Sequence, residues 1–312
     1  MRRYFAAVLA VLGLGVGPAA AWNDKGHMVI ARLAWKGLTP DERAAVVGIL
    51  KAHPHYDEFL KAQRPEAMTE DEWVFLRAAA WADWVRSGSP DRRAFNHPPR
   101  HYINLPFVPA GSSATPKKPD AENIVTALGK SRREATAGGD RVNRAVAVTW
   151  LFHLTGDIAQ PLHCSELVSD RFPTGDRGGT RARVRLGDSL VQLHSFWDGL
   201  LGSGTTPSAI TAAVLEVEAL LDKSPEKWAV DVANHTTFAQ WADEGSAAAK
   251  THAYLNGRLE LASADGNAAP ESVPAAPDDY ARNSGEYARF AAGKAGKRLS
   301  AILRDVVAAN AD

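Results

Sequence analysis

The sequence predicts an all-α protein that carries one small β-hairpin. Apolar residues recur at helical spacing over seven stretches, several of these stretches begin or end at a capping residue or a proline, and only one segment alternates as a strand does. The predicted helices cover residues 26–35, 40–52, 70–84, 142–160, 207–221, 238–255 and 286–309.

Helix boundaries are marked at three places. Thr39 precedes Pro40 at one start, Ser208 follows a GSGTTP segment at another, and Pro161 ends the helix that contains His153. These residues favour helix termini because serine and threonine cap the first turn and proline cannot continue a helix.

The one segment with strand character covers residues 180–194. Val184 and Leu186 alternate with arginines, and Gly187 and Asp188 could turn the chain back on itself. Arginines occupy positions 181, 183 and 185, which favours a solvated basic edge over a track for a phosphate backbone.

Two stretches rich in Pro, Gly, Ser and Ala, residues 107–120 and 262–279, are predicted to be surface loops. Neither clearly separates two domains, and the candidate ligands described below lie on both sides of the first. We therefore expect a single catalytic domain over residues 22–312.

The first 21 residues have the pattern of a secretory signal. Arg2 and Arg3 form a basic start, residues 5–16 are apolar, and small residues end at Ala21. Cleavage after Ala21 would leave Trp22 as the first residue, either incidentally or for a reason given below. The sequence thus predicts a periplasmic or secreted protein.

Composition argues against a duplex-DNA-binding protein, a membrane-spanning protein and a disulfide-stabilised protein. Without Arg2 and Arg3, 34 basic residues face 36 acidic ones, a formal charge of −2 that argues against gripping long duplex DNA. No further apolar stretch is long enough to span a bilayer, so no membrane span is expected. Cys164 is the only cysteine, so no intramolecular disulfide is possible.

The segment HLTGDIAQPLHC carries the most chemical information. His153 and Asp157 lie four apart on one helical face, and His163 follows the break at Pro161. A second pair with the same spacing, His194 and Asp198, occurs in HSFWDG. For each pair taken singly, a structural histidine bonded to a helical aspartate is favoured over a metal ligand pair.

Further candidate ligands lie upstream. Asp83 is an acidic residue in an apolar helix, where it could also be an exposed carboxylate or a partner of Arg86. His101 begins a short extended segment and could be a partly buried polar residue. His27 lies five residues after Trp22, whose α-amino group would become a nitrogen ligand once cleavage frees it.

Taken together, these residues resemble the S1/P1 family of zinc-dependent, single-strand-specific nucleases found in fungi, plants and bacteria. The segments that carry the resemblance are WNDKGH, WADWVR, HYINLP, HLTGDIAQPLHC and HSFWDG, in the family's order. The absence of disulfides, which the eukaryotic members have, indicates a bacterial member.

The resemblance implies three zinc ions and assigns their ligands. One ion would be held by Asp83, His101, His153 and Asp157, a second by Asp157, His27 and the amino and carbonyl groups of Trp22, and a third by His163, His194 and Asp198. Zinc would activate water for attack on phosphorus, and the third ion would stabilise the leaving oxygen.

The resemblance also implies roles for residues near the ligands. Asp83 and Arg86 would be catalytic, with Arg86 supporting charge on the phosphoryl group unless it only pairs with Asp83. Tyr102 would stack on a base, although from the sequence alone such a tyrosine is more often a core aromatic. Asn104 stands where the family commonly has an aspartate that contacts the base, so base preference is open. Cys164 fits a small buried thiol better than a soft zinc ligand.

The function implied is hydrolysis of single-stranded DNA and RNA to 5′-mononucleotides by a monomer, with an associated 3′-nucleotidase activity. Two alternatives stay open at this point. One is a zinc-dependent phospholipase C of the same fold, disfavoured by Asp198 and by the short spacing from Trp22 to His27. The other is an exported zinc-binding protein without catalytic turnover. The preference between DNA and RNA and the pH optimum are not determined by the sequence.

Overall fold

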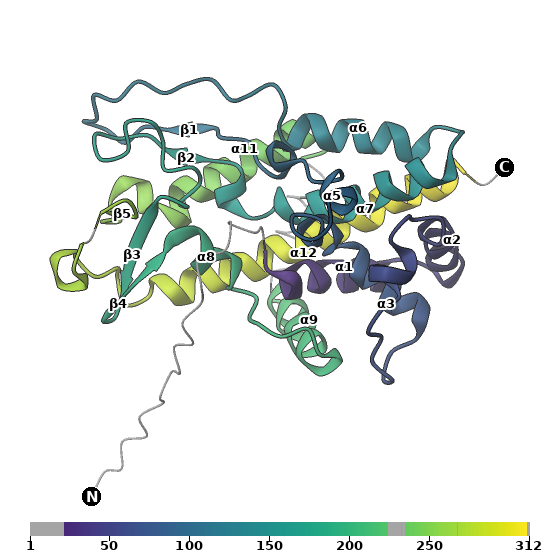
Figure 1. The fold of residues 1–312 in the computed structure, drawn as a ribbon. Coiled ribbons are helices and arrows are strands. Elements are labelled where there is room, and N and C mark those ends of the chain that lie inside the picture. The colour runs from purple at the N-terminus through teal and green to yellow at the C-terminus, as the bar shows by residue number, and fades with distance from the viewer. Residues whose placement is uncertain (1–21, 224–231, 233–234, 267, 311–312) are drawn as a thin grey trace, which may run out of the picture.

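The computed structural model of the protein describes residues 22–223, 232, 235–266 and 268–310. The predicted signal over residues 1–21 and the tryptophan at position 228 lie outside these ranges. Within them the all-α prediction is confirmed, since helices form nearly all the regular structure and the strands are short (Figure 1). None of the described helices is both long and apolar enough to cross a bilayer.

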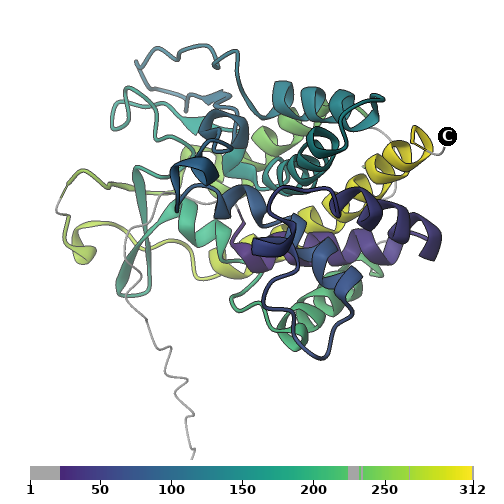
Figure 2. The same cartoon turned by 45° about the vertical axis from the view of Figure 1, so that its right-hand side comes forward.

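Three helices form the framework of the fold, and two of them carry candidate ligands. The long C-terminal helix α12 (Tyr280–Ala308) packs against α1 (Asp24–Gly37), and α7 (Arg141–Asp157) lies against both (Figures 1 and 2). α1 and α12 cross closely at Gly296, where a Cβ atom would lie 2.5 Å from the Cβ of Leu33. Only glycine permits this approach.

The remaining helices surround that framework. They are α2 (Pro40–Leu50), α3 (Glu70–Ala78), α4 (Trp81–Trp84), α5 (Pro90–Arg93), α6 (Ile124–Thr136), α8 (Leu193–Asp198), α9 (Pro207–Leu221) and α11 (Phe238–Ala248). Short 3₁₀ or π turns occur at η1 (Tyr56–Leu60), η2 (Pro98–His101), η3 (Pro161–His163), η4 (Ala249–Ala253), η5 (Leu255–Gly257) and η6 (Pro270–Ser272).

Most predicted helices are confirmed, and the caps explain their starts. Thr39 caps α2 through a reciprocal capping box with Glu42, and α9 has the predicted bounds. The cap of α9 is Thr206 rather than Ser208, because its hydroxyl accepts the N–H of Ala209. Helix α7 ends at Asp157, three residues earlier than predicted, and the turn η3 follows at Pro161.

The prediction of one continuous helix over residues 70–84 was wrong. The helix is interrupted at Ala79 and Ala80, between α3 and α4. The break leaves the Ala79 carbonyl to accept the Nδ1–H of His153 at 2.7 Å. Apolar periodicity continues across the break, which is why the sequence did not reveal it.

Helix α6 was not predicted at all. Its sequence is polar, but Asn123 caps it by accepting the N–H groups of Val125 and Thr126. Its buried residues recur at helical spacing, namely Ile124, Ala127, Leu128, Ser131 and Ala135. The cap and this weak periodicity were signals in the sequence.

The predicted hairpin is confirmed. Strands β3 (Ala182–Leu186) and β4 (Ser189–Gln192) pair antiparallel, with Val184 opposite Val191. A third strand, β5 (Ala262–Ser263), adds to β3 from within the predicted loop 262–279, and Arg181 pairs with Asp265 there. β1 (Pro106–Phe107) and β2 (Glu166–Leu167) form a separate parallel pair.

The core contains most of the tryptophans, as predicted. Trp22, Trp81 and Trp197 are completely buried, and Trp73, Trp150 and Trp241 nearly so. The Cys164 thiol is fully buried against Gly245, where an added Cβ would lie 2.8 Å from Sγ. Its prediction as a small buried thiol is confirmed.

Gly296→Ala should destabilise the protein, because the new methyl group must displace Leu33 at the crossing of α1 and α12. We expect a loss of about 1–3 kcal/mol in the free energy of unfolding, measured in urea. Gly48→Ala is the matched control, since no atom lies within 4 Å of its Cβ position. That variant should gain about 0.5–1 kcal/mol from helix propensity. Equal stability of the two variants would contradict the close crossing.

Candidate metal centre

The structure brings the predicted side-chain ligands together in three groups. They are His27, Asp83 and His153; His101, His153 and Asp157; and His163, His194 and Asp198. Within each group the potential ligand atoms lie within 4.8 Å of one another. The first two groups share His153, so they form one cluster, which we call the Asp157 cluster; the third is the His194 group.

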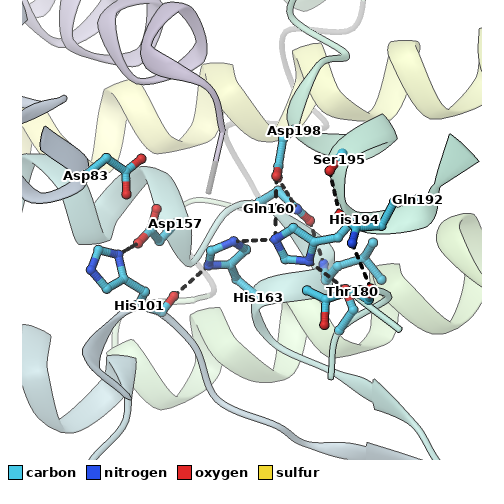
Figure 3. Close-up of polar contacts among 12 residues, drawn as sticks. Asp83, His101, Asp157, Gln160, His163, Thr180, Gln192, His194, Ser195 and Asp198 are labelled. Carbon is cyan, nitrogen blue, oxygen red and sulfur yellow. Dashed lines mark hydrogen bonds and ion pairs between the residues drawn. The ribbon is translucent and has the colours of Figure 1, made fainter. Parts of the chain in front are cut away.

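Asp157 is the centre of its cluster. Its Oδ1 lies 3.3 Å from His27 Nε2, and its Oδ2 lies 2.9 Å from His101 Nδ1 and 3.1 Å from His153 Nε2. One turn of α7 places His153 beside Asp157, and α1 contributes His27. The turn η2 contributes His101, whose ring faces Asp157 (Figure 3). The prediction that His101 begins an extended segment was wrong, since the chain becomes extended only at Tyr102.

Two glycines admit the N-terminal segment to this cluster. A Cβ at Gly156 would lie 2.7 Å from His27 Nδ1, and one at Gly26 would lie 2.8 Å from the Cβ of Trp22. The Trp22 side chain is completely buried. The chain just after it is tied to the His194 group, because the Asn23 N–H donates to the Asp198 carbonyl at 3.3 Å.

The His194 group is arranged around two imidazoles. The Nε2 atoms of His163 and His194 lie 3.1 Å apart, and Asp198 Oδ2 lies 3.6 Å from the latter (Figure 3). Gln160 donates from Nε2 to Asp198 Oδ1 at 2.8 Å, which leaves Oδ2 for the imidazoles. Gln160 was not among the predicted residues, although it lies in the most informative segment.

Backbone carbonyls fix the orientation of three imidazoles. The Nδ1–H of His153 donates to Ala79 O at 2.7 Å, that of His163 to His101 O at 2.6 Å, and that of His194 to Gly178 O at 2.6 Å. Each neutral ring then presents the Nε2 lone pair toward its group. Such outer hydrogen bonds orient histidine ligands at metal sites. Two lone pairs at 3.1 Å repel each other unless a cation or proton lies between them.

The donor set fits metal ions. Several buried polar atoms of these side chains make no hydrogen bond, namely His27 Nδ1, Asp83 Oδ2 and His101 Nε2. Buried polar atoms without a hydrogen bond are uncommon, and these three lie on ligand-type side chains. Imidazole and carboxylate groups are typical ligands of zinc and similar ions.

Burial keeps most of these imidazoles neutral. It lowers the pKa of His101 and His163 to about 4 and that of His194 to about 3. His153 differs, because the nearby charges of Asp157 and Asp83 outweigh burial and raise its pKa. Burial would raise the pKa of Asp157, but the adjacent histidines hold it well below its ordinary range. Neutral imidazoles and an ionised carboxylate are the forms that bind metal.

A cleft of about 570 Å³ opens above the ligands. His101, His163 and His194 line it together with Arg86, Tyr102 and Asn104. Arg86 Nη2 lies 2.7 Å from Asp83 Oδ1 and 3.0 Å from His101 Nδ1, so it both pairs with Asp83 and faces the cleft. Tyr102 is 37% exposed, which excludes a core role.

The cleft wall thus offers a cation, an aromatic ring and an amide above a floor of metal ligands. This arrangement can bind an anion next to a planar group. Six of the predicted site residues line this one cleft, whereas Asp83 lines a separate hollow.

Comparisons with known proteins agree with this geometry. The sequence profile described as S1/P1 nuclease matches residues 22–308. Endonuclease 2 of Arabidopsis thaliana is 26% identical over 253 residues, covering 75% of this chain and 77% of its own length. Endonuclease 4 of the same plant is 24% identical over 244 residues, covering 74% of this chain and 72% of its own length.

Asp157→Asn should remove metal without unfolding the protein. The amide keeps the shape of the carboxylate but loses the charge that three imidazoles share. We expect the purified variant to lose most of its bound metal, measured by atomic emission, while circular dichroism stays helical. Asp170→Asn, at an exposed position, is the control and should keep its metal. Unchanged metal content in Asp157→Asn would contradict a central role for this carboxylate.

The metal-free protein should lose stability as the pH falls from about 6.5 to about 4. In that window the histidines of the unfolded chain bind protons, whereas His101, His163 and His194 stay neutral in the folded protein because they are buried. Proton binding therefore favours the unfolded state. Each such imidazole contributes a slope of roughly 1.4 kcal/mol per pH unit. His163→Asn should flatten the curve, measured by urea unfolding across this window. A pH-independent stability of the metal-free protein would show that these rings are not held neutral.

Proposed function

The chain belongs to the S1/P1 nuclease family, as its motifs predicted, and on that premise we propose that it is a zinc-dependent phosphodiesterase. Its substrates are single-stranded DNA and RNA, which it hydrolyses to 5′-mononucleotides, and a 3′-nucleotidase activity accompanies this reaction. The family establishes the nuclease class. The metal, the products and the strand preference are our proposals.

One observation carries the proposal. The buried imidazoles of His101, His163 and His194, which belong to the Asp157 cluster and the His194 group, form the floor of a cleft whose wall holds Arg86 and Tyr102. A purely structural metal site is normally closed to solvent, whereas this floor opens onto a cleft. The open floor supports catalysis over a non-catalytic zinc-binding role.

Three zinc ions are proposed, in the arrangement that the family resemblance implies. His163, His194 and Asp198 would hold one, and the Asp157 cluster with the Trp22 amino and carbonyl groups would hold two. When bound, zinc supplies a water nucleophile at neutral pH and stabilises charge on the leaving oxygen. The histidine-rich donor set supports zinc over magnesium or calcium, which prefer oxygen ligands.

The residues of the wall would position the substrate. Arg86 would donate hydrogen bonds to the phosphoryl oxygens, while its pairing with Asp83 keeps the guanidinium in place. Tyr102 would stack on an unpaired base, and Asn104 beside it could donate as well as accept a hydrogen bond. Paired bases cannot enter such a slot, which accounts for a preference for single strands.

Export completes the proposal. Removal of residues 1–21 would free the Trp22 amine as a ligand and place the enzyme, as a monomer, in the periplasm or the medium.

The direct test is an assay on matched substrates. The purified enzyme should degrade a single-stranded oligonucleotide, spare the same sequence in a duplex, and lose activity to a chelator until zinc is restored. A soluble choline-phosphate ester tests the phospholipase alternative. Hydrolysis of that ester without cleavage of nucleic acid would overturn the proposal.

Tyr102→Ala should weaken substrate binding through lost stacking. We expect KM for a single-stranded oligonucleotide to rise about tenfold, since stacking on an aromatic ring contributes about 1–3 kcal/mol per base. Tyr102→Phe is the matched control and should retain most of the affinity, because the ring remains. Equal kinetics of the alanine variant and the wild-type enzyme would place the base elsewhere.

A further inference from the structure

One cation at the cleft has no part in the site described so far. Arg177 is exposed and lines the same cleft as Tyr102 and His163. Its backbone lies in the left-handed region, at a φ of 52°. Residues other than glycine seldom adopt this conformation, and where they do, the surrounding structure must hold them there.

The chain on both sides of Arg177 is firmly held. The buried carboxylate of Asp176 accepts the Leu167 N–H at 2.8 Å and the Tyr254 hydroxyl at 2.9 Å. On the other side, a Cβ at Gly178 would lie 2.2 Å from the Leu162 carbonyl oxygen, so only glycine fits. The position of Arg177 is therefore imposed by its neighbours rather than by a contact of its own side chain.

The segment around Arg177 also contacts the His194 group. The carbonyl of Gly178, the next residue after Arg177, accepts the Nδ1–H of His194 at 2.6 Å. The same short loop thus orients a candidate metal ligand and places a cation beside it. Arg86 approaches the ligands from a different element, after α4, through Asp83 and His101.

The guanidinium of Arg177 makes no hydrogen bond or ion pair with any residue in the described ranges. Other arginines nearby do: Arg181, four residues later, pairs with Asp265. Arg177 does act on one nearby carboxyl through its charge. Burial raises the pKa of Glu166, and the charge of Arg177 opposes this by lowering it. Asp120 contributes a carboxylate to the same cleft. An unpaired guanidinium that extends from a firmly held backbone into a cleft is suited to an anionic ligand.

We propose that Arg177 binds a second phosphate of the nucleic acid strand, adjacent to the scissile one. This inference rests on the proposed nuclease function. Arg86 lies at the ligand cluster, where the scissile phosphate would be held. Arg177 lies on a separate loop beside the His194 group, so it would contact a neighbouring phosphate instead. It would make the enzyme prefer longer strands to substrates with a single phosphodiester.

The test compares two substrates that differ in phosphate number. A dinucleoside monophosphate has only the scissile phosphate, whereas a longer single-stranded oligonucleotide has flanking ones. Arg177→Ala should lower kcat/KM for the oligonucleotide about tenfold, the effect of losing one charge-assisted hydrogen bond. It should leave kcat/KM for the dinucleoside monophosphate within about twofold, because that substrate has no second phosphate. Arg177→Lys should restore part of the loss.

Salt dependence gives an independent readout. Removing one phosphate contact should make the slope of log kcat/KM against log salt shallower by about 0.7 for a single strand. Arg171→Ala is the matched control, because Arg171 is exposed on the same loop region but lines a different hollow. That variant should keep the wild-type slope.

The possible failures are distinguishable. A wild-type enzyme that cleaves neither substrate would defeat the proposed function itself. If the wild-type enzyme cleaves both, equal losses in Arg177→Ala on the two substrates, or no loss on either, would overturn the second phosphate site. Arg177→Gly separates charge from backbone strain, since glycine adopts this conformation freely. It should show the same selective loss with full metal content, and a loss of metal instead would assign Arg177 a purely structural role.

Discussion

The structure depends on ionised and lone-pair groups gathered in a dry interior. Asp157 and His153 are completely buried, and His27 and His101 approach them within hydrogen-bonding range or close to it. Burying such groups without a charge partner costs several kcal/mol, so a bound cation would stabilise the arrangement. Bound metal would supply that cation, in a chain whose single cysteine leaves it no disulfide.

Local features that would otherwise be defects serve this centre. The break between α3 and α4 provides the Ala79 carbonyl for His153, and the left-handed loop at Gly178 provides another for His194. Gly156 gives the His27 ring room against α7. The same loop that orients His194 also holds Arg177 at the cleft, so the proposed metal binding and strand binding would depend on one piece of backbone.

The sequence predicted which candidate ligands converge better than it predicted their surroundings. Pairs such as His153 and Asp157 share a helical face by spacing alone, so their convergence could be predicted once the family motifs were seen. The hairpin followed from alternation. Helix α6 was missed because its apolar face is narrow and its sequence polar, and the break at Ala79 was missed because periodicity runs through it. Gln160 and Arg177 act through tertiary position, which no local pattern encodes.

The central claim is that a processed N-terminus completes a metal centre that hydrolyses single strands. Trp22 lies buried beside Gly26, and the next residue bonds to the Asp198 carbonyl, so a terminus freed at Trp22 would lie next to the candidate ligands. The decisive measurement is zinc content and single-strand cleavage of protein beginning at Trp22 and of protein with one extra residue before it. We predict three zinc ions and activity in the first, and the loss of one ion and most activity in the second. Equal zinc content and equal activity in both would contradict the claim.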